Sequence, residues 1–251
     1  PMEVMIHRAV ETGLQGITFT EHLDPDYPVT PDNLVFSLDI PAYKEKLAEL
    51  SDMYKDKIQV RFGIELGLQM HLGEYFDSLL SQTPFDFVIG SSHLVHGYDP
   101  YYPEFFEGRK EFLCYMEYFE SILENISAYD GFDVYGHIDY VVRYGPNKNR
   151  EYSYGRYKDI LDEILKKLIS IGKGIELNTG GYHYGLGEPN PCTAVISRYR
   201  ELGGEIITIG ADAHTPDKIA CAFNKAARVL EACGFRYYTI FKDRKPEFIS
   251  L

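Results

Sequence analysis

Histidine and acidic side chains stand at the ends of several short, β-rich runs of this 251-residue sequence. Imidazoles and carboxylates are the ligands that zinc, manganese and iron take in proteins. Six such side chains would be costly to bury without partners, and a bound metal removes that cost. The sequence therefore predicts a metal centre, and its candidate ligands are His22, Glu65, His93, His137, Asp212 and His214.

Two places in this set suggest how the centre is built. Glu65 lies in the central run "VRFGIEL" (60–66), where a carboxylate can bridge two cations through its two oxygens. Asp212 and His214 are two residues apart at the end of "EIITIGADAH" (205–214). Because side chains alternate along a strand, a strand through both residues would place them on one side. A single buried histidine is more often a hydrogen-bonded core residue, but five such strand ends favour the metal centre.

These side chains need elements that bring distant parts of the chain together. Short β-rich runs alternate with helical patterns, which predicts a parallel sheet. All strand ends share one face in a (β/α) barrel, whereas a doubly wound sheet gathers its ligands at one switch point. Six contributing strands favour the barrel, and the sequence has neither a GxGxxG nor a Walker loop. We predict strands at 16–22, 60–66, 85–93, 132–139, 174–181 and 205–214, and helices at 1–13, 43–54, 111–128, 157–171, 193–202 and 216–232.

Composition limits the partners of the chain. Its net charge is −13 and 45% of its residues are hydrophobic, which suits one α/β domain over residues 1–251. This acidity argues against a nucleic-acid partner, and no run of apolar residues is long enough for a membrane partner. The four cysteines have no CxxC spacing, which is typical of free thiols in a reducing compartment, so we expect a cytoplasmic protein. The oligomeric state stays open.

Six short motifs, taken in chain order, match a known family. They are "TEH", "GIELGL", "SSH", "GHIDYVVRYG", "ELNTGG" and "GADAH", and they resemble the motifs of the PHP (polymerase and histidinol phosphatase) superfamily. The histidinol-phosphatase branch is the most similar, and its tail resembles "YYTIFKDRKPEFISL". The resemblance covers essentially the whole chain. It implies an α/β fold, a distorted (β/α)7 barrel of PHP type, with two to three divalent metal ions (Zn, Mn or Fe).

The resemblance also implies a role for each candidate ligand. Glu65 resembles the bridging carboxylate, and His93 and His137 resemble ligands of one metal. His22 and His214 resemble ligands of a second metal. Asp212 resembles a ligand of the remaining metal. The implied catalytic residues are Glu65, His137, Asp212 and His214.

Two further residues are candidates for binding substrate. Arg143, in "HIDYVVR", resembles a phosphate-contacting arginine, and its planar fork suits phosphate oxygens. The alternative for Arg143 is a surface arginine that follows a strand. His183, in "NTGGYHYG", stands near where histidinol phosphatases often carry an arginine in a Gly-Leu-Arg context. A histidine can still donate to phosphate, but this departure weakens the assignment of the substrate.

A second departure concerns the start of the barrel. The family opens with a strand that ends in His-x-His, and this sequence contains no such motif. We therefore expect six visible strands, with the family's first strand missing and one metal short of ligands. Either the chain is a fragment, or the strand was lost.

These observations predict a metal-dependent phosphomonoesterase that hydrolyses L-histidinol phosphate in histidine biosynthesis, by means of a metal-activated hydroxide. Two alternatives remain, a PHP phosphoesterase for another small phosphomonoester and a degenerate metal-binding barrel without activity. The aromatic stretch 96–108 is either a lid over the site or an ordinary packed surface loop.

Overall fold

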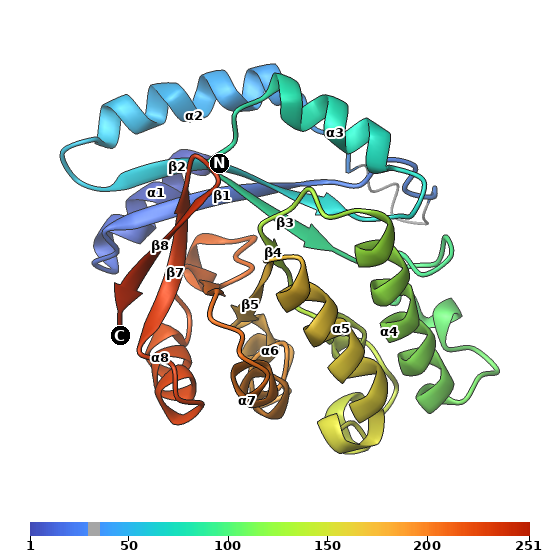
Figure 1. Ribbon diagram of the computed structural model, residues 1–251. Helices are drawn as coiled ribbons and strands as arrows, with labels where there is room; N and C mark the ends of the chain where they lie inside the picture. The colour runs from blue at the N-terminus through green and yellow to red at the C-terminus, as the bar shows by residue number, and fades with distance from the viewer. Residues whose placement is uncertain (30–35) are drawn as a thin grey trace.

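A parallel sheet forms the centre of the computed structural model, which describes residues 1–29 and 36–251. Each strand pairs in parallel with the next strand along the chain, in the order β1-β2-β3-β4-β5-β6 (Figure 1). This sequential order is that of a singly wound barrel sheet and not of a doubly wound sheet, whose strand order reverses. The strands are β1 (Gly16–Leu23), β2 (Gln59–Gly67), β3 (Phe87–Ser91), β4 (Val134–Tyr135), β5 (Gly174–Asn178) and β6 (Ile207–Gly210).

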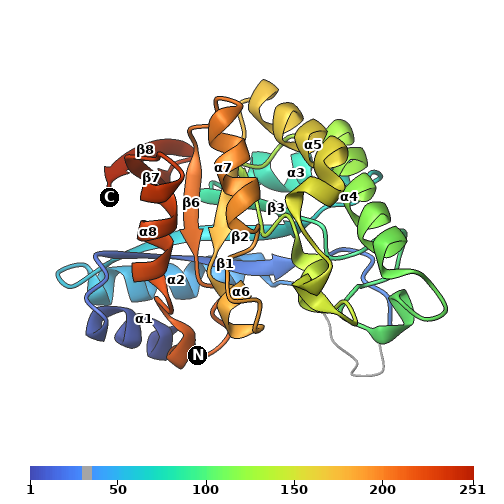
Figure 2. The same ribbon diagram turned by 90° about the horizontal axis from the view of Figure 1, so that it is seen from below.

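Helices cover the outside of this curved sheet, and Figure 2 shows α4, α5, α7 and α8 arranged around it. The 3-10 turns η1 (Pro103–Phe105), η2 (Tyr140–Arg143), η3 (Lys148–Arg150), η4 (Tyr154–Tyr157) and η5 (Pro216–Lys218) lie in the connections. The α-helices are α1 (Met2–Glu11), α2 (Ile40–Tyr54), α3 (Gly73–Gln82), α4 (Glu111–Ala128), α5 (Lys158–Ser170), α6 (Gly180–His183), α7 (Thr193–Glu201) and α8 (Phe223–Ala232).

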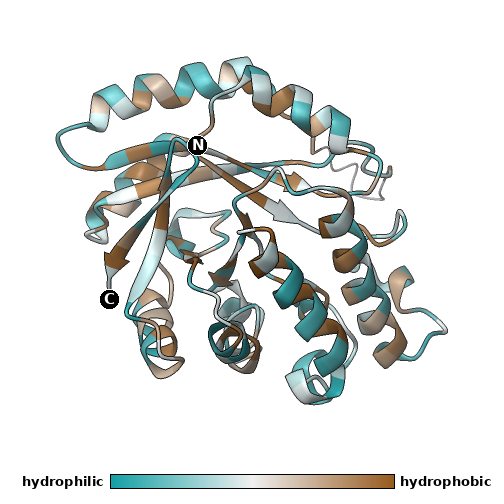
Figure 3. Cartoon of the chain, viewed as in Figure 1, coloured by the Kyte–Doolittle hydropathy of each residue, from teal (hydrophilic) through white to brown (hydrophobic). Residues whose placement is uncertain are grey.

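Helical periodicity explains how the helices pack against the sheet. In α5 the apolar side chains of Leu161, Ile164, Leu165 and Leu168 recur at spacings of three and one, and all four are fully buried. Figure 3 shows the matching alternation of hydrophobic and hydrophilic stretches along the outer helices. Burial of the apolar stripes between helix and sheet fixes the strands, and with them the loops that follow their carboxyl ends.

The curved sheet stays open on one side. Among the described residues no ladder joins β6 to β1, and a cavity of about 1260 Å³ lies between them. An antiparallel hairpin, β7 (Tyr237–Lys242) and β8 (Lys245–Ser250), packs beside β6, where the Ile207 backbone N–H donates to Thr239 Oγ1 at 3.2 Å. Six parallel strands with helices outside agree with the predicted α/β class.

Several predicted boundaries are wrong. Helix α2 begins at Ile40 because the Asp39 carboxylate accepts from the Ala42 backbone N–H and caps it. The predicted helix at 216–232 is broken, because α8 begins only at Phe223. No helix is predicted at 73–82, where α3 forms, although Phe76, Leu79 and Leu80 recur at helical spacing and pack in or against the core.

Two strand predictions also need correction, and both concern the site. The predicted strands at 132–139 and 205–214 shrink to two and four residues, β4 and β6. Asp212 therefore does not lie on a strand, and its backbone adopts a left-handed conformation with φ 51°. The premise that alternation along a strand puts Asp212 and His214 on one side is wrong, since the chain has already turned after Gly210.

Candidate metal centre

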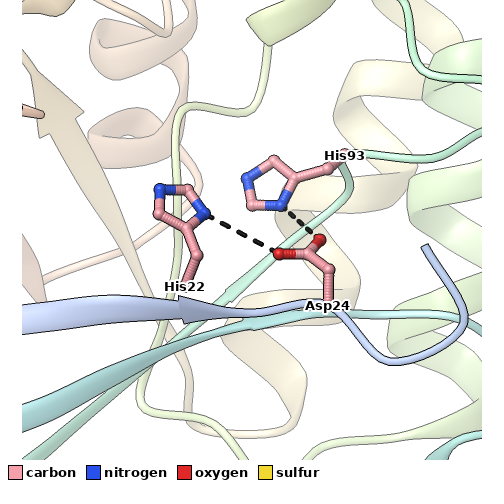
Figure 4. Close-up of side chains that lie close together, drawn as sticks. All are labelled: His22, Asp24 and His93. Atoms are coloured by element: carbon pink, nitrogen blue, oxygen red, sulfur yellow. Dashed lines mark hydrogen bonds and ion pairs between the residues drawn. The ribbon is translucent and has the colours of Figure 1, made fainter. Parts of the chain in front are cut away.

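The first group of candidate ligands joins the ends of β1 and β3. His93 Nδ1 is 2.7 Å from Asp24 Oδ1, and His22 Nδ1 is 3.8 Å from Asp24 Oδ2 (Figure 4). His22 is the penultimate residue of β1, and Asp24 directly follows that strand. One ligand atom from each of the three residues lies within 4.8 Å of the others, so the group can hold a metal ion.

Glu65 stands in the middle of the cluster. Its Oε1 is 3.0 Å from His137 Nε2 and 3.2 Å from His93 Nε2, and its Oε2 is 3.8 Å from His22 Nε2. Glu65, His93 and His137 form a second group with metal-ligand spacing, in which all three residues are buried. Because both oxygens of Glu65 face imidazoles from different strands, this carboxylate is placed to bridge two cations.

A third group lies at the end of β6. His214 Nε2 is 3.3 Å from Asp212 Oδ1, and the His214 and His22 rings stack with centroids 5.7 Å apart. His22, Asp212 and His214 have metal-ligand spacing. All six ligands predicted from sequence are therefore brought together, and His22 is shared between the first and third groups.

Neighbouring charges set the pKa values in the cluster. Burial alone would raise the pKa of Glu65, but the imidazoles of His22, His137 and His93 hold it well below its usual range. Asp24 follows the same balance, because the two imidazoles beside it outweigh burial and lower its pKa to about 2. Burial lowers the pKa of His93, but Asp24 and Glu65 raise it well above the ordinary value. A divalent cation can supply the same charge compensation.

Buried atoms without hydrogen-bond partners test whether these residues fit a metal. Asp24 Oδ2, His93 Nε2 and His137 Nδ1 are such atoms, and all three belong to the cluster. Buried polar atoms are normally hydrogen-bonded, so exceptions at one place call for an explanation. Nitrogen and carboxylate donors of this kind suit a divalent metal, and the residues therefore fit the ion that the sequence predicts.

Arg143 lies beside this cluster and is buried, with 3% of its surface exposed. Its Nε donates to Asn190 Oδ1 at 2.8 Å, its Nη1 to Asp212 Oδ2 at 2.6 Å and its Nη2 to Asn178 Oδ1 at 3.1 Å. The alternative of a surface arginine is wrong. The ion pair with Asp212 also links the predicted phosphate contact directly to a candidate metal ligand.

Aromatic rings flank the Arg143 guanidinium. Its Cζ is 4.7 Å from the Tyr184 ring centroid and 5.5 Å from that of Tyr140. Nearby, His183 Nδ1 is 3.5 Å from Cys221 Sγ, and His183 Nε2 is buried without a hydrogen-bond partner. Burial, Lys218 and Arg143 lower the pKa of His183. Both predicted substrate-binding residues thus lie near the β5 and β6 end of the cluster.

Two acidic residues of the site are not among the predicted ligands. Asp24 stands two residues after His22, the same spacing that drew attention to Asp212 and His214, so this signal was available. A Cβ on Gly67 would come within 1.9 Å of Asp24 Oδ1, so Asp24 needs a glycine beneath it.

The second missed acid is Glu176, which is buried inside β5. Its Oε2 accepts from the His137 backbone N–H at 3.1 Å and from Asn178 Nδ2 at 3.0 Å. Burial and the nearby charge of Glu65 raise the pKa of Glu176 to about 8. Glu176 is the first residue of the motif "ELNTGG", but no role was assigned to it, because a single acid within an apolar run has no characteristic spacing.

Comparison with known proteins agrees with this geometry. The family model described as the PHP domain matches residues 1–180. The chain is 30% identical to the histidinol-phosphatase of Lactococcus lactis subsp. lactis, over 96% of this chain and 88% of that protein. It is 31% identical to a probable histidinol-phosphatase of Clostridium acetobutylicum, over 92% of this chain and 88% of that protein. The chain therefore belongs to the PHP domain family.

Two solved structures have the same fold. The crystal structure of histidinol phosphate phosphatase from Lactococcus lactis, complexed with zinc, L-histidinol and phosphate, has a TM-score of 0.90 and 29% identity, over 98% of this chain and 92% of that chain. A putative histidinol phosphatase from Listeria monocytogenes has a TM-score of 0.77 at 18% identity, over 89% of this chain and 93% of that chain, and this likeness shows the fold. The predicted family and the predicted PHP-type fold are confirmed.

Other expectations concern cysteines and membranes. All four cysteines are free, as predicted. Within residues 1–29 and 36–251, no helix has the length and apolarity that crossing a membrane requires.

Proposed function

We propose that this protein is a metal-dependent phosphomonoesterase that hydrolyses L-histidinol phosphate to L-histidinol and phosphate. The observation that carries the proposal is the set of three His and carboxylate groups, which share His22 and His93 at the carboxyl ends of the strands. The relatives with the histidinol-phosphatase name support the choice of substrate, since they align over most of the chain.

The metal ligands in this proposal are His22, Asp24, Glu65, His93, His137, Asp212 and His214. When bound, divalent metals polarise phosphoryl oxygens as Lewis acids and lower the pKa of water. Three groups that share residues favour two to three ions. Zinc is favoured by the zinc in the Lactococcus structure, and manganese and iron suit the same donors. A cytoplasmic location stays a prediction.

Arg143 orients the phosphate in this proposal. A guanidinium has five N–H donors, and the three bonds to Asn190, Asp212 and Asn178 leave one on each Nη for phosphate oxygens. Its charge stabilises the equatorial oxygens of the transferring group. The Asn190 side chain also donates to Oδ1 of the buried Asp139 at 2.6 Å. This bond fixes the orientation of Asn190, which in turn accepts from the Arg143 guanidinium.

His183 supplies a second phosphate contact. When the Cys221 thiol donates to Nδ1, the ring proton lies on Nε2, which has no protein partner. That N–H can donate to a phosphoryl oxygen.

Phosphate release from L-histidinol phosphate tests the proposal. The chain is freed of metal and reloaded in turn with Zn²⁺, Mn²⁺ and Fe²⁺, and its kcat/KM is compared with that for a panel of other small phosphomonoesters. We expect metal-dependent turnover with a clear preference for L-histidinol phosphate, and loss of turnover in Glu65→Gln. Equal turnover of the panel would contradict the substrate, and no turnover with any metal would contradict the enzyme.

A further inference from the structure

Asp99 is a buried carboxylate in the segment that follows β3, and its hydrogen-bond donors among the described residues are neutral. Tyr27 Oη donates to its Oδ2 at 2.5 Å, and Tyr140 Oη donates to its Oδ1 at 3.3 Å. The Tyr101 backbone N–H donates to Oδ1 at 2.7 Å. The side chain is largely withdrawn from water, since Asp99 is 8% exposed.

Three other aspartates that are buried or half-buried have cationic partners. Asp133 pairs with Arg244, Asp162 with Arg198 and Asp212 with Arg143. In the part of the chain that the structure describes, no Lys, Arg or His side chain forms an ion pair with Asp99. Burial raises the pKa of Asp99, as expected for a carboxylate whose charge is poorly compensated.

Asp139 also forms no ion pair with a described residue, but its position differs. It is 1% exposed and accepts from Asn190 Nδ2 and from the Cys192 backbone N–H, so it serves as an internal anchor. Asp99 instead retains a surface edge and is surrounded by phenol rings. A carboxylate among aromatic faces is an environment that suits an organic cation, which gains from both the charge and the rings.

The Tyr140 ring separates Asp99 from the candidate metal centre. The Tyr140 ring that reaches Asp99 has its centroid 5.7 Å from that of His93 and 5.1 Å from that of His137. The same Tyr140 ring lies 5.5 Å from the Arg143 guanidinium carbon. Tyr140 therefore contacts a cationic group suited to phosphate and an anionic group without a cation of its own.

We propose that Asp99, with Tyr27 and Tyr140, binds the ammonium end of a cationic phosphomonoester while the metal centre and Arg143 hold its phosphate. This inference rests on the proposed function and adds the residues that set substrate specificity. L-Histidinol phosphate fits, because it carries a primary amine that is protonated at neutral pH. A monoester of an uncharged alcohol would leave Asp99 without its cation.

The competing explanation is that Asp99 only anchors the segment 96–108. That segment is already held by Phe105 and Phe106, which are 3% and 7% exposed. Asn in place of Asp99 keeps an oxygen that can accept from Tyr27, Tyr140 or the Tyr101 N–H, but it removes the charge. Asp99→Asn therefore separates cation binding from anchoring.

The test compares two substrates and two binding measurements for Asp99→Asn and the original protein. We expect KM for L-histidinol phosphate to rise about tenfold or more, the loss typical of one charged hydrogen bond. kcat/KM for p-nitrophenyl phosphate should stay unchanged. By calorimetry, L-histidinol should bind about tenfold more weakly to Asp99→Asn, while inorganic phosphate binds equally.

Glu124→Gln is the matched control, because it removes one negative charge from an exposed glutamate that contacts His96. It should leave both substrates unaffected. An equal loss for both substrates in Asp99→Asn, or unchanged L-histidinol binding, would overturn the proposal. An original protein that turns over p-nitrophenyl phosphate but not L-histidinol phosphate would contradict the proposed substrate instead. The binding measurement needs no turnover and therefore separates the two failures.

Discussion

Asp24 illustrates how much one side chain contributes to this centre. It faces His93 and His22 with its two oxygens, and Oδ2 has no hydrogen bond. It is a proposed ligand that belongs to neither the motif set nor the predicted ligand list. Because it stands between two imidazoles, it both orients His93 and completes the first group of ligands.

Replacement of Asp24 by Asn should therefore remove metal. We expect the bound metal per chain to fall by about one ion and kcat/KM to fall about 100-fold, as for groups that orient metal ligands. Metal analysis by mass spectrometry and phosphate-release assays measure both. Asp26→Asn is the control, because its exposed side chain pairs with His71 on the surface. Full metal content in Asp24→Asn would contradict its role.

Helices α5 and α7 are joined by a bidentate ion pair. Arg198 Nε donates to Asp162 Oδ1 at 2.9 Å and its Nη2 to Oδ2 at 2.7 Å, while Tyr154 Oη donates to Oδ1 at 2.6 Å. Arg198 is the main cause that lowers the pKa of Asp162 from 3.8 to about 2, and Tyr154 assists. None of these three residues is a candidate metal ligand, so we expect the link to affect stability and not chemistry.

The pH dependence of stability should reveal this link. A pKa that is lower in the folded state stabilises the protein above the unfolded value and stops doing so as pH falls through the folded value. Asp162 should therefore contribute about 2 kcal/mol to the free energy of unfolding above pH 4, lost between about pH 4 and pH 2.

Denaturant unfolding at a series of pH values measures this effect. In Asp162→Asn the slope of the free energy of unfolding between pH 4 and pH 2 should be smaller than in the original protein. Asp159→Asn, an exposed position of the same helix, should keep the original slope. An unchanged slope in Asp162→Asn would refute the link.

At the scale of the whole molecule, the main feature is the open side of the sheet between β1 and β6. β1 and β6 do not pair, yet both edges supply ligands to the third group, His22 from β1 and Asp212 with His214 after β6. Metal bound there would join the two edges across the cavity. Binding of any ligand to the folded state alone stabilises it.

Metal removal should therefore loosen both edges at once. At a metal concentration 100-fold above Kd the gain is about 2.7 kcal/mol, so a chelator should lower Tm on the order of 5–10 °C. Amide hydrogen exchange in β1 and β6 should accelerate more than in β3. Glu65→Gln removes the charge of a proposed ligand, so we expect it to hold metal poorly and to respond little to the chelator. Unchanged exchange in β1 and β6 would mean that metal does not join these edges.

The donor set and the alternation of strands and helices followed from the sequence. Imidazoles and carboxylates after apolar runs identify a metal chemistry by residue type alone, and apolar periodicity is a local property of the chain. The order of six motifs was enough to predict the family and the PHP-type fold, both of which are confirmed.

Tertiary structure alone decided which side chains meet. The Asp24 to His93 contact spans 69 residues of sequence, and the Arg143 to Asn190 contact spans 47. No local pattern encodes such distances, because they depend on how each strand ends and on what packs beneath it. The turn at Asp212, the partners that bury Arg143 and the carboxylate of Asp99 among phenols arise only when the folded sheet brings its loops to one face.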